Sequence, residues 1–408
     1  MPFPKFGTVL ACALTIASLH AQPSLVITLA SVRDRVHSQN PDLAAARLRI
    51  REARARLKQA GRLSNPELES SFRHNPAFNE GSFEIGLSQR FPLTNRLQLE
   101  KEVSLTELEA AAMEVKDVER RLAAEASTAL IEVLAIRLQR ELLAGQNQLT
   151  TELAESIRQA AEKGEGSLLD AGQAKVEALQ AATQIRQLDA TEAAAIGRLK
   201  PLLGMRVDEN PVVSGKLPDA VLPAAGANPG QRPDYRSAKL ETHAAGQNVA
   251  LEQARRIDDA EAGFFTGIER TEDAPNGRSN EGIIGVRFKI ALPFWNKNEG
   301  KIEEAQALHI RKQLETTALG RSIELEAEAA LSEMRQWARF ADEISSQLLP
   351  LATEQADKTE TAYKSGQADL QTVLRSREQR LRLAGSRLDA LREFHLARIR
   401  YQSALGNF

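Results

Sequence analysis

The chain has no proline between Pro92 and Pro201, and this interval limits what it can fold into. Proline removes a backbone hydrogen-bond donor and clashes with the carbonyl one turn earlier, so helix interiors normally exclude it. A helix from about 95 to 162 would be roughly 100 Å long at 1.5 Å per residue. Apolar side chains recur in it at steps of three or four, the spacing of an amphipathic or coiled-coil seam: Leu108, Ala112, Val115, Val118, Leu122, Ala126, Ala129, Val133 and Ile136. The sequence therefore predicts a rod that no globular domain could enclose.

This rod is expected to turn back on itself at a glycine-containing break. Two glycines lie in KGEGS (163–167), after which the apolar pattern resumes toward Leu203. The second half repeats the plan, with a helical stretch from about 298 to 363, a break at KSGQA (364–368) and a return helix. Pro350 lies inside the descending stretch, so we expect a kink there.

The chain appears to start a second time at residue 232, where it reads RPDYRSAKL, matching NPDLAAARL at residue 40. We therefore predict a first repeat over 22–204, with a helical hairpin at about 95–204, and a second over 233–408, with a hairpin at about 297–406. The connector, 205–232, is rich in proline and glycine and is expected to be non-helical. The match extends to single glycines, because Gly164 and Gly366 lie 202 residues apart, as do Gly204 and Gly406.

Each repeat also contains a stretch that alternates apolar and polar residues, which favours strands. We expect strands at about 66–74 and 82–92 in the first repeat, and at about 260–270 and 281–293 in the second. These two regions hold half of the aromatic residues. Strands of about ten residues with one apolar face and aromatics near their ends fit transmembrane β-strands. The alternative is a soluble hairpin packed on the helices.

The first residues, MPFPKFGTVLACALTIASLHAQP, have the layout of a secretory signal peptide, a lysine followed by a short apolar stretch. We assign residues 1–21 to this signal. The only cysteine, Cys12, lies inside it, so the mature chain would carry no thiol and no disulfide. Lipid attachment at Cys12, within VLAC, is the alternative.

Composition and motifs exclude several classes of function. The net charge of -2 and the pI near 6.4 offer no basic field for nucleic acid. The sequence contains no GxSxG, HExxH, CxxC or Walker loop, and its six histidines are scattered. We therefore expect no enzyme activity, no cofactor and no resident metal site.

Strands embedded in a membrane would require several copies of the chain. Four strands cannot close a barrel, since about eight are needed even for a filled one. Open sheet edges cannot face lipid, because their backbone groups would stay unsatisfied. The long helices would then continue the same wall as a tube on one side of the membrane. The fold expected is mainly α with a small β part.

Across 28–408 the chain resembles the TolC-type outer-membrane efflux proteins. The stretches that carry this resemblance are NPDLAAARLRIREARARL, SQRFPL, RPDYRSAKLE, LPFWNKNEGKIEEA, AYKSGQADLQTVLRSREQRL and YQSALG. LPFWNKNEGKIEEA and LLPLATEQADKTETAYKSG are most similar to the branch that serves heavy-metal efflux. After the first hairpin the chain reads PLTNR, without the Gly-Lys-Arg that this branch often shows.

The resemblance implies a homotrimer with a twelve-stranded outer-membrane β-barrel continued by a periplasmic α-helical barrel. Its tip would dock a periplasmic adaptor that links it to an inner-membrane pump, so the chain would be a passive conduit. Carried onto this sequence, the residues implied at the docking tip are Gly164, Ser167, Leu168, Gly366, Ala368 and Leu370. A family member narrows its closed tip with aspartates, and the candidates here are Asp170, Asp369, Thr372 and Arg375.

Other functions remain open at this stage. The same architecture would serve a multidrug or type I secretion duct. A periplasmic adaptor would carry one helical hairpin between small β domains rather than two in tandem. An exported structural coiled coil would lack the paired alternating strands.

Overall fold

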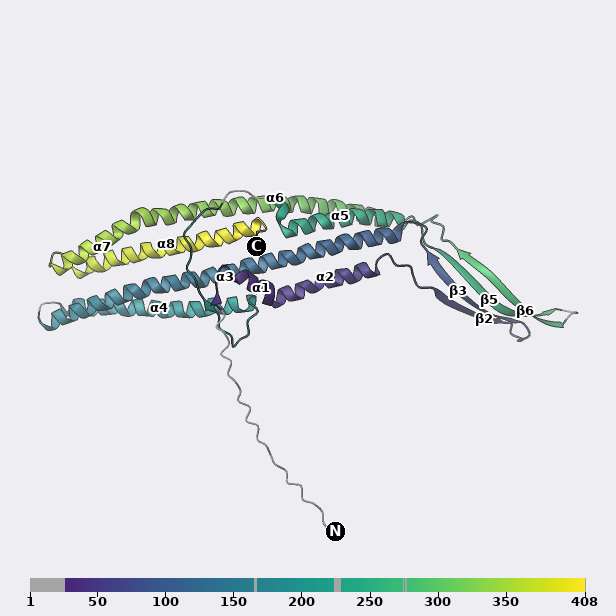
Figure 1. The fold of residues 1–408 in the computed structure, drawn as a ribbon, viewed down its shortest axis with the longest axis horizontal. Helices are drawn as coiled ribbons and strands as arrows, with labels where there is room; N and C mark the ends of the chain where they lie inside the picture. Colours follow the sequence, from purple (N-terminus) through teal and green to yellow (C-terminus); the bar gives the residue numbers. More distant parts are fainter. Residues whose placement is uncertain (1–25, 165–166, 224–228, 274, 276, 408) are drawn as a thin grey trace, which may run out of the picture.

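The computed structural model describes residues 26–164, 167–223, 229–273, 275 and 277–407. The expected signal peptide, with Cys12, lies outside these residues, as does part of the 163–167 break. The described chain is elongated, with long helices over most of its length and a small sheet at one end (Figure 1). This is the mainly α architecture with a small β part that the sequence predicts.

The long helices form close to the expected bounds. In the first hairpin α3 runs without a break over Arg96–Glu162, 67 residues, and α4 returns over Leu168–Leu202. In the second, α6 spans Glu299–Glu343, α7 spans Leu349–Lys364 and α8 spans Leu370–Ala404. In the part of the chain that the structure describes, no helix combines the length and the apolarity needed to cross a membrane.

The predicted kink is a π-helical segment, Ile344–Leu348, between α6 and α7. Pro350 explains its position, because the proline ring clashes with the carbonyl four residues earlier, that of Ser346. The hydroxyls of Ser345 and Ser346 each donate to a carbonyl one turn back at 2.7 Å. In the first repeat Gln148 stands 202 residues before Pro350, and α3 continues through it as regular helix.

The helices lie side by side as a wall (Figure 1). Near the turns the order across the wall is α4, α3, α8, α7. Near the sheet it is α2 (Pro41–Gln59), α3, α5 (Pro233–Ala254), α6. A short helix, α1 (Val32–Gln39), packs on α3. The wall thus has two opposite edges, one formed by α2 and α4, the other by α6 and α7.

The repeated NPDL and RPDY stretches start α2 and α5, with proline in the first turn, where its missing N–H does no harm. The side chain of Asn40 caps α2 by accepting from the Leu43 N–H at 2.9 Å. Each start lies against a helix-ending glycine with positive φ. A Cβ on Gly204 would lie 2.1 Å from a carbonyl oxygen at the end of α1, and one on Gly406 would lie 2.9 Å from the Arg232 Cα. The paired glycines therefore permit both a left-handed turn and a close backbone approach.

The connector, 205–232, contains two short regular elements that the sequence did not predict. Its strand β4 (Val212–Val213) pairs in parallel with β1 (Val26–Ile27), and a 3₁₀ turn, η1, spans Pro229–Gln231. The expectation of a wholly non-helical connector is corrected to that extent. Pairing with β1 was hidden because two-residue strands leave no periodic pattern.

This connector crosses the wall and is attached to successive helices. The guanidinium of Arg137 on α3 donates to the Val213 carbonyl. The Nε2 of the buried His395 on α8 lies 2.8 Å from the Pro218 carbonyl oxygen. Ala220 then packs against the apolar cluster shared by α6 and α8. The connector therefore holds three helices together at mid-height.

The sheet is antiparallel, in the order β2 (Glu67–His74), β3 (Gly81–Phe91), β5 (Ala260–Asp273), β6 (Gly277–Lys289). The first pair agrees with the expected strands. The second pair differs, because the stretch from 271 to 280, expected as a loop, is mostly strand, and β6 ends at Lys289 rather than at 293. The extra length of the second hairpin therefore lengthens its strands rather than its loop.

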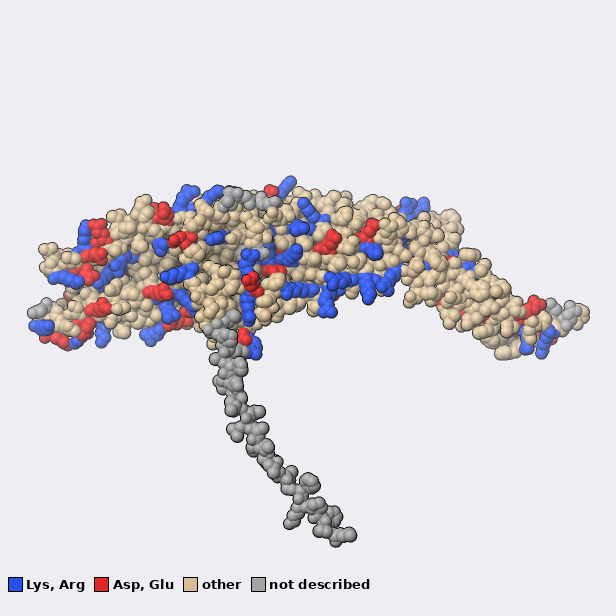
Figure 2. All heavy atoms as spheres, viewed as in Figure 1, with Lys and Arg blue, Asp and Glu red and all other residues tan. Residues whose placement is uncertain are grey.

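The two faces of the sheet have opposite character. In Figure 2 charged side chains crowd the helical part, whereas the sheet is largely uncharged up to its far end. One face is made by exposed apolar side chains in register across all four strands: Leu68, Phe72, Phe83, Ile85, Leu87, Phe264, Ile268, Ile284, Val286 and Phe288. The other face carries ion pairs.

Those ion pairs show that the sheet curls. Arg287 on β6 contacts Glu69 on β2 at 3.0 Å, although β3 and β5 lie between them. In a flat sheet these strands would be about 14 Å apart. Arg287 also lies 5.3 Å from the centre of the Phe265 ring on the same face. The polar face is therefore concave and the apolar face convex, while β2 and β6 keep one free edge each in the described residues.

Candidate functional site

The end of the helical wall away from the sheet consists of two helix turns placed as the sequence predicts. Gly164 ends α3 with φ +80° and Gly366 ends α7 with φ +75°. No atom lies within 4 Å of a Cβ built on either glycine. The backbone conformation, and not lack of space, therefore favours glycine at these two turns.

The helices that leave these turns are capped by residues that correspond in the two repeats. Ser167 accepts from the Asp170 N–H at 3.4 Å at the start of α4. Asp369, 202 residues later, accepts from the Thr372 N–H at 2.8 Å and from the Thr372 hydroxyl at 2.5 Å at the start of α8. These hydrogen bonds, that from the hydroxyl first, lower the pKa of Asp369. The carboxylate of Asp369 is thus engaged in its own helix cap.

The apolar residues at the turns differ in exposure. Leu168 is exposed, and so is Leu169 at 80%, a residue that the sequence reasoning did not single out. Ala368 is half-buried. Leu370 is 3% exposed and packs with Leu153 of α3 in the core of the tip, so it offers no surface to a partner in this conformation. Leu370 became buried through contact with another hairpin, which its own sequence neighbourhood could not reveal.

A buried arginine joins the two hairpins just above the turns. Arg377 on α8 contacts Glu360 on α7 at 2.5 Å and donates to the Leu149 carbonyl of α3 at 3.3 Å. Lys364 is the second partner of Glu360, at 3.1 Å. The hydrogen bond from Arg377 is the largest influence that lowers the pKa of Glu360. We call Arg377, Glu360 and the Leu149 carbonyl the tip latch.

The four candidate gate residues lie around the turns without forming one cluster. Asp170 is half-buried, and burial, followed by the charge of Asp170, raises the pKa of Tyr363 on α7. Thr372 and Arg375 are exposed on α8. Asp369 is held in its cap. The gate thus stays a prediction, and the tip latch is a connection between hairpins that sequence spacing did not indicate.

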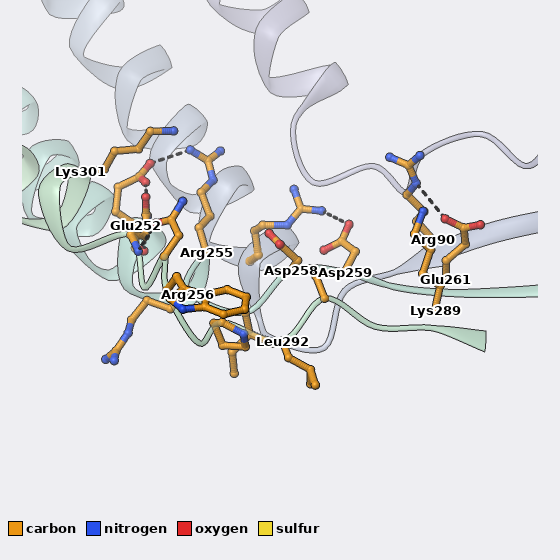
Figure 3. Close-up of a pocket in the computed structure, with 17 residues that line it drawn as sticks. Arg90, Glu252, Arg255, Arg256, Asp258, Asp259, Glu261, Lys289, Leu292 and Lys301 are labelled. Atoms are coloured by element: carbon orange, nitrogen blue, oxygen red, sulfur yellow. Dashed lines mark hydrogen bonds and ion pairs between the residues drawn. The ribbon is translucent and has the colours of Figure 1, made fainter.

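At the other end of the wall, charged residues line an open cavity of about 790 Å³ where strands meet helices (Figure 3). Arg96 at the start of α3 pairs with Asp259 at 2.6 Å, and Arg255 at the end of α5 pairs with Glu252 at 2.6 Å. Burial opposes ionisation of Glu252, but hydrogen bonds from Asn298 and Arg255 outweigh it and lower the pKa of Glu252. These pairs tie the start of α3, the end of α5 and the loop before α6 together.

Neither end resembles a catalytic or metal centre. Within the described ranges, no group of three or more His, Cys, Asp or Glu side chains could hold a metal ion. The charges of the strand–helix cavity are largely neutralised by their ion pairs. Both ends are suited to contacts between protein elements.

Comparison with known proteins identifies the fold and the family. Residues 32–205 match the family described as outer membrane efflux protein. This first repeat belongs to the outer membrane efflux protein family. Proteins of this family are outer-membrane channels with a periplasmic helical domain, not enzymes, and this efflux protein shares that localisation. No curated protein matches the chain.

Solved structures extend the likeness in fold to the whole chain. The outer-membrane channel OprN superposes with a TM-score of 0.73 at 18% identity, covering 93% of this chain and 90% of OprN. CusC gives 0.74 at 18% identity, covering 93% and 92%. The outer membrane protein VceC of Vibrio cholerae gives 0.73 at 18% identity, covering 93% and 96%. Both repeats of this efflux protein therefore take part in one channel fold.

Proposed function

We propose that three copies of this chain form the passive outer-membrane duct of a tripartite efflux system. The observation that carries the proposal is the curled sheet, whose convex face is apolar and exposed while its concave face holds the ion pairs. Such a sheet suits lipid outside and water inside. The unbroken helices of the wall would continue the duct into the periplasm.

The number of copies is argued from the free edges of the sheet. Each chain offers four strands with unpaired edges at β2 and β6, which lipid cannot satisfy. Two copies would give eight strands, whose interior side chains would fill. Three copies give twelve, enough for a water-filled interior. This agrees with the trimer implied by the resemblance to TolC-type proteins.

We propose heavy-metal cations as the cargo. The resemblance of LPFWNKNEGKIEEA to the heavy-metal branch supports this, and so does the charge of the concave face. Acidic residues on that face outnumber basic ones, as Glu67, Glu69, Glu84, Glu261, Glu269 and Glu281 against Arg73, Arg90, Arg287 and Lys289. Glu269 and Glu281 lie directly opposite each other and form no ion pair with a described residue. A negative lining favours passage of cations.

The two turns of the tip are the proposed docking surface for a periplasmic adaptor, which would connect the duct to an inner-membrane pump. Leu168 and Leu169 present exposed apolar side chains there, next to the flexible geometry of Gly164. Ser167, Gly366 and Ala368 lie at the same turns. Opening of the tip latch, together with Asp170, Asp369, Thr372 and Arg375, is the proposed gate.

Fractionation tests the duct. We expect the protein in outer-membrane extracts as a trimer that dissociates on heating, whereas a soluble periplasmic monomer would refute the proposal. For cargo, cells that lack the gene should become sensitive to metal salts and regain resistance when it is restored. Sensitivity to organic drugs alone would favour the multidrug alternative.

Cross-linking tests the docking surface. A photoreactive residue at Leu168 should cross-link to an adaptor in intact cells. The same probe at Ile310, which is exposed on α6 far from the tip, is the matched control and should not. Equal capture from both positions would argue against docking at the tip.

A further inference from the structure

The outer edge of α4 carries a shallow apolar groove that nothing in this chain fills. It has a volume of about 440 Å³ and is lined by Val176, Leu179, Gln180, Thr183, Gln184 and Gln187. These residues lie on the side of α4 opposite Ala174, which is buried in the tip core. Leu179 is 57% exposed. None of the lining residues is charged, which is unusual for this highly charged wall.

The opposite edge of the wall offers an apolar side chain of matching kind. Leu351 on α7 is 64% exposed, while Ala352, Ala356 and Thr359 of the same helix pack toward α8. The charged residues beside it are satisfied within α7, because Lys358 pairs with Glu354 at 2.6 Å. Leu351 is therefore available to a neighbour without a charge having to be desolvated.

The groove and this leucine lie at the same height above the turns. Leu179 follows Gly164 by 15 residues and Leu351 precedes Gly366 by 15 residues. At 1.5 Å per residue both are about 22 Å from their turn. α4 leads away from the tip and α7 leads toward it, so the two edges are antiparallel (Figure 1).

The sheet offers its free edges on the same two sides. Figure 1 shows β6 on the side of α6 and α7, and β2 on the side of α2 and α4. Any ring of copies that joins β6 of one chain to β2 of the next also brings α7 of the first beside α4 of the second. Such an interface is heterologous and closes only by rotation.

We propose that Leu351 of each copy fills the α4 groove of the next copy, against Val176 and Leu179. This seam rests on the proposed trimer and deepens it by naming the residues that join the copies near the tip. A knob from one helix then occupies a hole on its antiparallel neighbour, as in a coiled coil. Each groove is complete only with a residue from the partner copy.

Disulfide trapping tests the seam directly, since the only natural cysteine, Cys12, lies in the expected signal peptide. The double variant Leu179→Cys with Leu351→Cys should give a covalent ladder up to the trimer when outer-membrane vesicles are oxidised. Each single variant should give none. The matched control pairs Leu179→Cys with Leu325→Cys, an exposed residue of α6 about 40 Å higher up the wall, and should give no ladder.

The outcomes separate the seam from the duct. If the wild-type protein is a heat-sensitive trimer but the 179/351 pair gives no ladder, the seam is wrong and the duct stands. If the wild-type protein is not a trimer, both fail. A charge swap guards against variants that do not assemble: Leu179→Glu and Leu351→Lys should each weaken the trimer to heat, and together restore it. A double variant no better than the singles would overturn the seam.

Discussion

Neutralising Glu360 should loosen the tip more than neutralising its partner Arg377. The two side chains differ in what each leaves behind. Arg377 is 7% exposed and its other contact is the Leu149 carbonyl, so Glu360→Gln leaves a buried guanidinium without a counter-ion. Glu360 is 30% exposed and keeps Lys364 at 3.1 Å, so Arg377→Met leaves a carboxylate that is still paired.

The magnitudes follow from burial. Removing one partner of a buried ion pair costs several kcal/mol, and the partial exposure of Glu360 reduces this to about 3 kcal/mol for Glu360→Gln. For Arg377→Met the lost hydrogen bonds are offset by burying an apolar side chain, which leaves about 1 kcal/mol. Each 1.4 kcal/mol is a tenfold change, so local opening should rise roughly a hundredfold in the first variant and about fivefold in the second.

Amide hydrogen exchange along α7 and α8 of the purified trimer measures this opening. The matched control is Glu378→Gln on α8, whose pair with Arg382 is exposed on both sides and should change exchange little. If Arg377→Met exchanges as fast as Glu360→Gln, the argument from the orphaned guanidinium is refuted. An equally fast control would show that the assay reports charge alone.

The latch also predicts a pH dependence. The pKa of Glu360 is lowered in the folded protein, so its contribution is full above the ordinary carboxyl pKa near 4.5 and is lost as the pH falls below it. The difference in melting temperature between the wild-type protein and Glu360→Gln should therefore shrink in that acid range. A difference that persists there would contradict the assigned charge of Glu360.

Three further perturbations have defined outcomes. Gly204→Ala should lower the denaturation midpoint, by about 1–2 kcal/mol from its positive φ and more from the close carbonyl, whereas Gly197→Ala, with nothing within 4 Å, should gain about 1 kcal/mol. Ile284→Lys on the convex face should cost about 2–4 kcal/mol in lipid and reduce the yield of outer-membrane trimer, whereas Ile283→Lys on the concave face should not. Burial lowers the pKa of His395, so melting temperature should fall as the pH drops below about 6.5, and His395→Gln should flatten that slope; an unchanged slope would refute it.

Local patterns in the sequence were sufficient for the elements that local physics determines. The absence of proline predicted the 67-residue α3, and the 202-residue spacing predicted two pairs of glycines that all have positive φ. The alternation of β3 predicted its apolar face. Each of these depends on residues within one helix turn or one strand, so periodicity could reveal it.

Contacts between distant segments explain what the sequence did not show. The stretch 271–280 resembles a loop because it contains Asn, Gly and Pro, yet cross-strand pairs such as Thr271 with Ser279 hold it as strand. Arg377 gave no signal of a latch, because its contact with Leu149 joins residues more than two hundred positions apart. Leu370 is buried for the same reason. The candidate docking and gate residues were placed at the tip, but their surroundings depend on the neighbouring hairpin.

The connector has a consequence for the order in which the chain can assemble. It leaves α4 early in synthesis and export, yet Pro218 contacts His395, and Ala220 packs on a cluster that includes Phe394. Both partners belong to the last helix to emerge. The strap can therefore be fastened only when the whole chain has been delivered. A chain cut before α8 would keep its first repeat and lose the closure that makes the wall a unit, so completeness of the polypeptide is checked by its own middle.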